Sequence, residues 1–163
     1  EQPGPQRTRF LYYLLFMKPP TIILDFNRTL YDPQRRQLVP YARRVLRALR
    51  RRGYRIILIS QARPGRAQRL RELDIDYYFD KLVFVRKKTQ RVFSRLLPTR
   101  ADDRKRCTVV GDRVREEIAL GKIFGCKTIW VKQGKFSDEG PRNFGEMPDV
   151  TVPRLAVILA VME

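Results

Sequence analysis

Residues 20–32 of the chain read PTIILDFNRTLYD, an apolar run that ends at a carboxylate. The run from Ile22 to Leu24 is unbroken and largely β-branched, which predicts a strand that is buried on both faces. Polar residues follow, beginning with Asp25. Because ligands of open parallel sheets bind at the carboxyl ends of the strands, Asp25 is either a site residue or an acid that caps the turn after a core strand.

Comparable apolar runs predict further strands at residues 54–59, 82–85, 107–110, 128–131 and 149–152. Helical spacing of apolar residues marks the segments 40–52, 64–73, 89–97, 115–124 and 153–162. Gly53 stands where the first helix should end, and Thr89 where the third should begin. The alternation predicts an α/β fold, a three-layer α/β/α Rossmann-like sandwich with a five- or six-stranded, mainly parallel sheet. Residues 132–148 show little periodicity, which predicts a loop that lies over one edge of the site.

The charge of the chain is strongly positive, with 35 Lys and Arg residues against 17 Asp and Glu and a formal net charge of +18. Such a surface attracts polyanions, so a nucleic-acid or phosphorylated partner is one interpretation. Arginines on solvated helix faces are the other, because aromatic residues are not interleaved with the basic ones as a platform for single-stranded nucleic acid requires.

The 163 residues include no histidine and two cysteines, Cys107 and Cys126, neither of them in a CxxC pair. The chain thus lacks the commonest general base, and catalysis would depend on carboxylates, lysines, hydroxyls or a bound cation. Without a disulfide pattern, both cysteines are expected to be small buried apolar side chains, and the protein is expected in the cytoplasm.

Residues 1–16 are expected to form a flexible or docking extension, and residues 17–163 a single domain. The first nine residues are polar, whereas residues 10–16 are apolar but much too short to span a bilayer. No small-residue cleavage site of a signal peptide follows them. Met17 is an alternative natural start, and a chain that begins there would then melt at an unchanged temperature.

Four polar groups stand at predicted strand ends or just before the next helix: Asp25, Ser60, one of two adjacent lysines at 87 and 88, and Asp112. The segments around the two aspartates read DFNRTL (residues 25–30) and GDRVREEI (residues 111–118). In this order, the groups resemble the four motifs of the haloacid dehalogenase-like (HAD) phosphatase superfamily. The resemblance covers residues 21–152.

The resemblance implies that Asp25 is the nucleophile that forms an aspartyl-phosphate. It also implies that Asp25, Asp112 and the backbone carbonyl of Asn27 hold Mg²⁺, with Glu116 or Glu117 reaching the metal through water. A transferring phosphoryl group carries charge on three oxygens, so a hard cation is needed to bring it to a carboxylate nucleophile.

The other motif residues are expected to bind the nucleophile or the phosphate. The resemblance implies hydrogen bonds from Thr29 to the nucleophile and from Ser60 to the phosphate, with Gln61 beside Ser60 in contact with substrate. The motif lysine pairs with the nucleophile and the phosphoryl charge. In the family this lysine lies two residues before the helix cap, which favours Lys87 and leaves Lys88 as a solvated neighbour able to meet the substrate.

Asn27 departs from the family, whose phosphatases place a second Asp there as general acid and base. An amide cannot give a proton to the leaving group or take one from the attacking water. General acid–base catalysis of this kind contributes about 10²–10⁴ in rate. Three interpretations remain: a phosphatase that is slow or acts on good leaving groups such as acyl phosphates, the use of another acid, or a binding protein that keeps the metal pocket. Arg28 stands where the family usually has Gly, and it is either a clamp for a substrate phosphate or a residue that points to solvent.

The spacing of the motifs leaves no room for a cap domain, since only about thirty residues separate Asp25 from Ser60. An open site favours a macromolecular substrate, or a partner that acts as a lid. With the basic surface, this favours a nucleotide or a phosphorylated nucleic-acid end. We therefore expect a Mg²⁺-dependent phosphomonoester hydrolase; the alternative is a catalytically impaired domain that binds nucleic acid or another phosphorylated partner.

Overall fold

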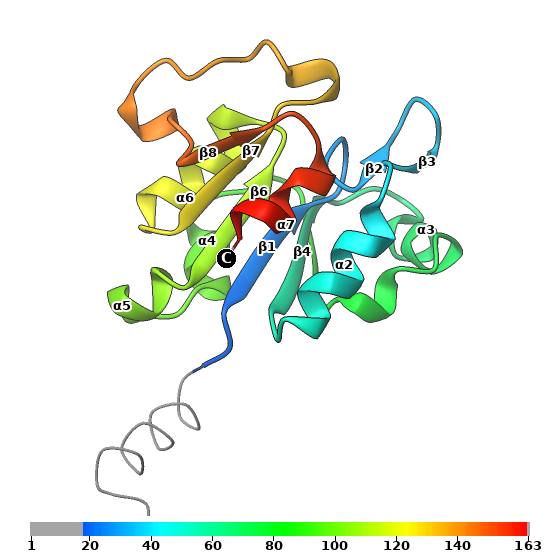
Figure 1. Ribbon diagram of the computed structural model, residues 1–163, viewed down its shortest axis with the longest axis horizontal. Coiled ribbons are helices and arrows are strands. Elements are labelled where there is room, and N and C mark those ends of the chain that lie inside the picture. The colour runs from blue at the N-terminus through cyan, green and yellow to red at the C-terminus, as the bar shows by residue number, and fades with distance from the viewer. Residues whose placement is uncertain (1–17, 163) are drawn as a thin grey trace, which may run out of the picture.

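The computed structural model describes residues 18–162, and the predictions for residues 1–16 and for a start at Met17 lie outside that part of the chain. Its centre is a parallel sheet of six strands in the order β5-β4-β1-β6-β7-β8 (Figure 1). The strands are β1 (Thr21–Asp25), β4 (Arg55–Gln61), β5 (Lys81–Val85), β6 (Cys107–Gly111), β7 (Lys127–Val131) and β8 (Val150–Val152). The predicted fold class is confirmed.

Helices cover both faces of the sheet, because alternate side chains of each strand point to opposite sides. One core cluster joins Ile22 and Leu24 of β1 to α2 (Ala42–Arg51), α3 (Arg66–Glu72) and α7 (Ile158–Val161). A second cluster joins Ile23 to α4 (Gln90–Leu96) and α6 (Ala119–Ile123). The sandwich therefore has the three layers that the alternating pattern predicts.

The helix ends follow local signals. Gly53 has a φ of +76° just after α2, a conformation that glycine adopts without strain. The Thr89 hydroxyl accepts a hydrogen bond from the backbone N–H of Val92 at 3.3 Å and caps α4. Both cap predictions are confirmed.

Other elements differ from the predictions. The helix expected at residues 115–124 begins with a π-helical turn, η2 (Val114–Ile118), before α6, and the closing helix is split into η5 (Leu155–Val157) and α7. Short elements that the pattern did not predict are β2 (Tyr31–Asp32), β3 (Gln37–Leu38), α5 (Ala101–Arg104), η1 (Asp76–Tyr78), η3 (Gly134–Phe136) and η4 (Phe144–Glu146). Elements of two to five residues carry too few side chains to show a period.

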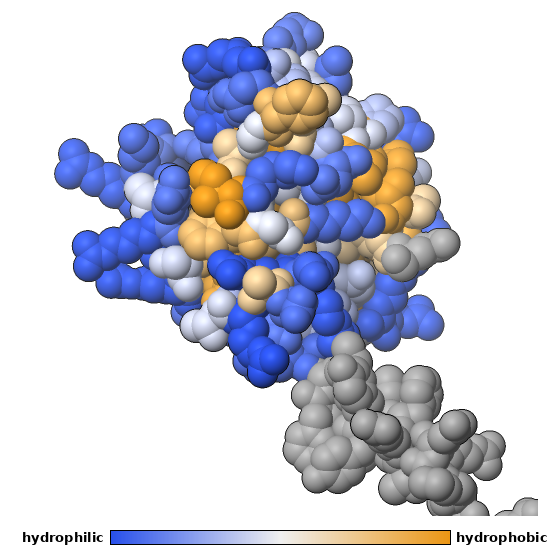
Figure 2. All heavy atoms as spheres, turned by 90° about the vertical axis from the view of Figure 1, so that its left-hand side faces the viewer, coloured by the Kyte–Doolittle hydropathy of each residue, from blue (hydrophilic) through white to orange (hydrophobic). Residues whose placement is uncertain are grey.

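No cap domain interrupts the described chain. Only the β2–β3 hairpin lies between β1 and α2, and only α3 and η1 lie between β4 and β5. No helix among residues 18–162 is long and apolar enough to cross a membrane. Hydrophilic side chains cover much of the face in Figure 2, around smaller apolar areas, and the exposed apolar side chains at α6 and η4 are Ile123, Phe144 and Met147.

Candidate active site

The candidate site lies at a switch point of the sheet. The chain runs from β1 to β4 and β5 on one side of β1, then returns to β6, β7 and β8 on the other. The loops after β1 and β6 therefore diverge and leave a crevice between their carboxyl ends. Asp25 ends β1 and Asp112 follows β6, and both side chains are almost fully buried there, with residue exposures of 4% and 1%.

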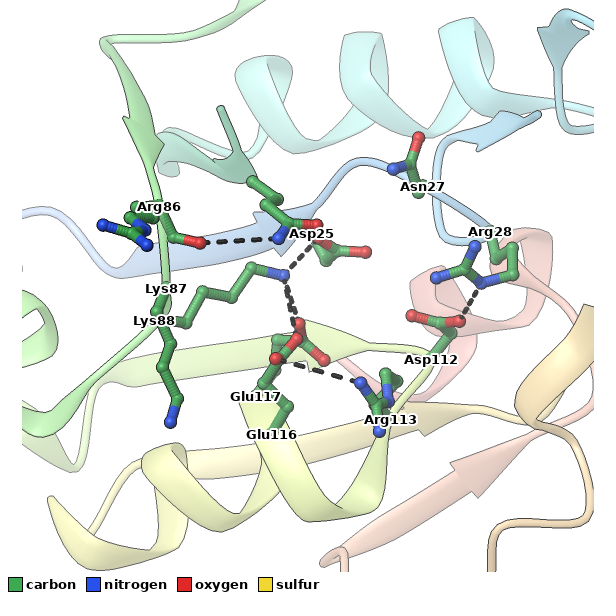
Figure 3. A pocket seen from close by; sticks show the side chains of 11 residues that line it. Asp25, Asn27, Arg28, Arg86, Lys87, Lys88, Asp112, Arg113, Glu116 and Glu117 are labelled. Atoms are coloured by element: carbon green, nitrogen blue, oxygen red, sulfur yellow. Dashed lines mark hydrogen bonds and ion pairs between the residues drawn. The ribbon is translucent and has the colours of Figure 1, made fainter. Parts of the chain in front are cut away.

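The buried lysine of this site is Lys88. Its Nζ donates to Asp25 Oδ1 at 2.5 Å and also to Glu117 Oε1 (Figure 3). Lys88 is 8% exposed, whereas Lys87 is exposed at the rim of the same pocket. The choice of Lys87 as the partner of Asp25 is therefore wrong. Thr89 is the cap as predicted. The buried lysine is Lys88, directly before the cap, and not Lys87, two residues before it.

Glu117 is the more buried of the two candidate acids. Its exposure is 1%, while the side chain of Glu116 is 32% exposed, 3.6 Å from Lys88 Nζ and 3.9 Å from Arg113 Nη1. The π-helical turn η2 carries Glu117 back under the end of β6. A Cβ at Gly111 would lie 2.8 Å from Glu117 Oε2, so the glycine of the GDRVREEI segment makes room for this carboxylate.

Burial and mutual repulsion set the ionisation of this cluster. Burial raises the pKa of Asp112 to about 7, helped by the charges of Asp25 and Glu117, although Arg28 opposes the shift. Burial likewise raises the pKa of Asp25 and of Glu117, against the attraction of Lys88. Burial alone would lower the pKa of Lys88, but the two carboxylates outweigh it and raise that pKa, so the lysine stays charged.

Arg28 turns into the site. Its Nε donates to Asp112 Oδ2 at 2.7 Å, and its guanidinium lies over the Phe136 ring at 4.6 Å. The backbone of Arg28 has a φ of +61°, and its carbonyl accepts a hydrogen bond from Gln133 Nε2 at 2.7 Å. The loop predicted at residues 132–148 thus lies over this edge of the site and holds Arg28 against Asp112. Sequence reasoning identified neither Phe136 nor Gln133, because nothing in their local pattern distinguishes them from other loop residues.

Asn27 is bound by an arginine that the sequence analysis did not single out. Its Oδ1 accepts a hydrogen bond from Arg66 Nη1 of α3 at 3.2 Å. The Arg66 guanidinium lies over the ring of Phe26 at 4.6 Å. Arg66 belongs to a helix with many arginines, and only the tertiary packing of α3 beside the loop after β1 distinguishes it.

Thr29, Ser60 and Gln61 differ in the contacts that their side chains make. Thr29 Oγ1 is buried without a hydrogen-bond partner among the described residues, so the predicted bond from Thr29 to Asp25 is not formed. Ser60 Oγ donates to the backbone carbonyl of Gln61 at 3.3 Å, and Gln61 lines the pocket with Arg86 and Arg113.

The donor set suits a small hard cation. The pocket encloses a cavity of about 150 Å³ and brings the carboxylates of Asp25 and Asp112 to the same crevice. Glu117 Oε2 is buried with no partner in the described chain, so negative charge there is not fully compensated. Residues 18–162 contain no group of three or more Cys, Asp or Glu side chains placed to hold a metal. Mg²⁺ is commonly held by one or two carboxylates, with water and substrate oxygens completing its shell, so two carboxylates and a backbone carbonyl fit it.

Comparisons with known proteins relate the chain to phosphatases and hydrolases. The HAD-hydrolase-like family model matches residues 84–158. A glyceraldehyde 3-phosphate phosphatase of Pyrococcus abyssi is 34% identical over 103 residues, which cover 60% of this chain and 43% of that protein. A protein of the same name from Pyrococcus furiosus is 28% identical over 131 residues, with coverages of 77% and 54%. The chain thus spans about half the length of these curated relatives.

Solved structures share the fold. A Streptococcus pneumoniae hydrolase described as a haloacid dehalogenase-like family protein superposes with a TM-score of 0.68 at 14% identity, covering 89% of this chain and 99% of that one. The magnesium-bound YfnB protein of Bacillus subtilis gives a TM-score of 0.64 at 16% identity, with coverages of 78% and 57%. These structures show the shared fold, while the family model and the curated relatives match the chain to haloacid dehalogenase-like hydrolases.

Proposed function

We propose that the protein is a Mg²⁺-dependent phosphomonoester hydrolase that acts through an aspartyl-phosphate on Asp25. The observation that carries the proposal is the buried Lys88, which binds Asp25 and Glu117 in the crevice that also contains Asp112. A nucleophilic carboxylate must be held, oriented and freed of competing water, and this arrangement meets all three needs. The phosphatase names of the two curated relatives support the same reaction class.

In the first step, Asp25 Oδ attacks phosphorus and the bond from phosphorus to the leaving oxygen breaks. The leaving oxygen takes the electron pair of the broken bond, and an alkoxide or phenolate product then takes a proton from solvent. In the second step, water attacks the phosphorus of the aspartyl-phosphate and loses a proton to solvent, and the bond from phosphorus to Asp25 Oδ breaks to give inorganic phosphate and the free carboxylate. Lys88 orients Asp25 throughout and offsets its charge, while Ser60, Gln61 and Arg28 bind phosphate oxygens.

Asp25, Asp112 and the backbone carbonyl of Asn27 would hold Mg²⁺, with Glu117 behind them. When bound, the cation would neutralise charge on the phosphoryl oxygens, so that a carboxylate could approach the phosphorus. Arg28 binds Asp112 Oδ2 and lines the pocket, where its guanidinium can also bind a phosphate oxygen.

Asn27 supports slow turnover or a preference for good leaving groups. Its amide carries no exchangeable acid proton, and its oxygen is bound by Arg66. Without general acid help, the leaving group must depart as an anion or wait for a proton from water. We therefore expect aryl and acyl phosphates to react faster than alkyl phosphates.

The experiment is the hydrolysis of 4-nitrophenyl phosphate with and without Mg²⁺. Turnover should require the cation and be lost in Asp25→Asn, while Asp138→Asn, at an exposed loop residue outside the pocket, serves as the matched control. Labelled phosphate trapped on wild-type protein and released by hydroxylamine would identify the acyl phosphate. Activity without Mg²⁺, or full activity in Asp25→Asn, would contradict the proposal.

A second candidate is a non-catalytic domain that binds phosphorylated partners, including a nucleotide or nucleic-acid end. The basic rim of the pocket, with Arg86, Lys87 and Arg113, favours it. It predicts binding that weakens steeply with salt and is indifferent to Asp25→Asn. Mg²⁺-dependent turnover would decide for the hydrolase.

A further inference from the structure

A second hollow lies beside the candidate active site and is lined by three arginines and one glutamate. It encloses about 330 Å³ between Tyr31 of β2 and the segment that leads into α3, with Arg63, Arg66 and Arg69 in its wall. We propose that it binds a second anionic group, a phosphate or a carboxylate, carried by the leaving group of the substrate. This inference rests on the proposed phosphatase function and adds the class of substrate to it.

Two hydrogen bonds connect the hollow to the active site. Asn27 Oδ1 accepts from Arg66 Nη1 at 3.2 Å, and Gln61 Oε1 accepts from Arg63 Nη2 at 3.4 Å. Asn27 and Gln61 line the active-site pocket, whereas the two arginines line the hollow. The hollow therefore lies beside the pocket, on the side of Asn27, where the family resemblance places the general acid that serves the leaving group.

Arg66 is held in place with donors to spare. Its guanidinium lies 4.6 Å from the centre of the Phe26 ring, which itself stacks on Tyr31 at 4.9 Å and an interplanar angle of 9°. A guanidinium has five N–H donors in a fixed plane. Among the described residues, Asn27 is the one hydrogen-bond acceptor recorded for Arg66, and its buried Nε has none. A fixed plane with unused donors suits a phosphate or carboxylate.

The positive charge of the hollow is only partly compensated, by Glu72, which also lines it. Arg69 pairs with Glu72 at 2.9 Å. Within residues 18–162, no carboxylate oxygen lies within 4.0 Å of Arg63 or Arg66, so these two cations have no ion-pair partner there. With a neutral leaving group such as glyceraldehyde, Arg63 and Arg66 would stay hydrated and unpaired. An anionic leaving group would form ion pairs with them. The chain should therefore differ from its curated relatives in preferring a substrate with a second negative group.

The test compares substrates that differ in this group alone or nearly so. Glyceraldehyde 3-phosphate and 3-phosphoglycerate differ by an aldehyde and a carboxylate, and fructose 6-phosphate and fructose 1,6-bisphosphate by a phosphate. We expect kcat/KM to favour the member with the additional anion by about tenfold, equivalent to about 1.4 kcal/mol. The first pair reports on a carboxylate and the second on a phosphate, and a preference in either supports the proposal.

Variants locate the effect. Arg63→Gln and Arg66→Gln should each reduce the preference several-fold, whereas Arg71→Gln, at an exposed position of the same helix outside the hollow, should not. Arg63 is exposed, so its replacement tests the site even if loss of the Arg66 packing on Phe26 unfolds the protein. A preference that persists in Arg63→Gln and in a folded Arg66→Gln would overturn the proposal.

Binding separates this inference from the proposed function. In Asp25→Asn, calorimetry at about 0.15 M salt should show tighter binding of fructose 1,6-bisphosphate than of fructose 6-phosphate, and Arg63→Gln should remove the difference. If no substrate is hydrolysed but this difference is found, the hollow is an anion site and the phosphatase proposal fails. If the protein hydrolyses phosphomonoesters with no preference for the additional anion in turnover or binding, the phosphatase stands and this inference fails.

Discussion

Replacement of Lys88 by Met should destabilise the metal-free protein strongly. Lys88 is the cation bonded to both Asp25 and Glu117, and all three residues are at least nine-tenths buried. Removing one partner from a buried ionic cluster leaves uncompensated charge and costs about 3–5 kcal/mol. For a domain of this size, 1 kcal/mol corresponds to about 2–4 °C, so the melting temperature should fall by about 6–20 °C at pH 7.

The exposed neighbour supplies the matched control. Lys87→Met changes the same side chain at the rim of the same pocket and should alter stability by about 0.5 kcal/mol or less. Lys88→Met combined with Glu117→Gln should recover part of the loss, because one of the two buried charges is then absent. Thermal and urea denaturation in EDTA measure all four proteins.

The loss should also depend on pH in a defined direction. Burial raises the pKa values of Asp25 and Glu117, and without Lys88 nothing of comparable strength opposes it. An acid whose folded pKa is raised destabilises the protein fully above the folded pKa, and the penalty shrinks as the pH falls from the folded toward the unfolded pKa. The difference between Lys88→Met and wild type should therefore be smaller at pH 5 than at pH 8. Equal melting temperatures for Lys88→Met and Lys87→Met, or a difference that does not change with pH, would refute the reasoning.

Three further predictions concern the same crevice. Asn27→Asp should accelerate the hydrolysis of phenyl phosphate more than that of 4-nitrophenyl phosphate. The difference should grow when Arg66→Gln removes the cation 3.2 Å away that would keep the new acid ionised. Equal rate gains for both esters would contradict this. Gly111→Ala should cost about 1–3 kcal/mol in urea denaturation, because its Cβ would lie 2.8 Å from Glu117 Oε2; unchanged stability would show that the carboxylate moves freely. In EDTA, ionisation of Asp112, whose pKa burial raises to about 7, should cost up to about 4 kcal/mol of stability between pH 4 and 8, and Asp112→Asn should remove that part of the pH dependence.

The strands and their order of appearance were predictable because their signals are local. An apolar run of four to six residues between turn signals identifies a buried strand whatever its neighbours are, and Gly53 and Thr89 mark helix ends through their own backbone or hydroxyl. Asp25 and Asp112 were placed at the site by the same reasoning, because each directly follows such a run.

The sequence alone determined the α/β class, the edge of the sheet that carries the site, and the residue types available for chemistry. Only the tertiary structure decided between Lys87 and Lys88, turned Arg28 onto Asp112 and brought Arg66 to Asn27. These contacts join residues 39 to 84 positions apart, and both lysines and most arginines have similar local surroundings. Which of them is buried depends on how α3, α4 and the loop after β7 pack at the ends of the strands, a property that no short stretch of sequence contains.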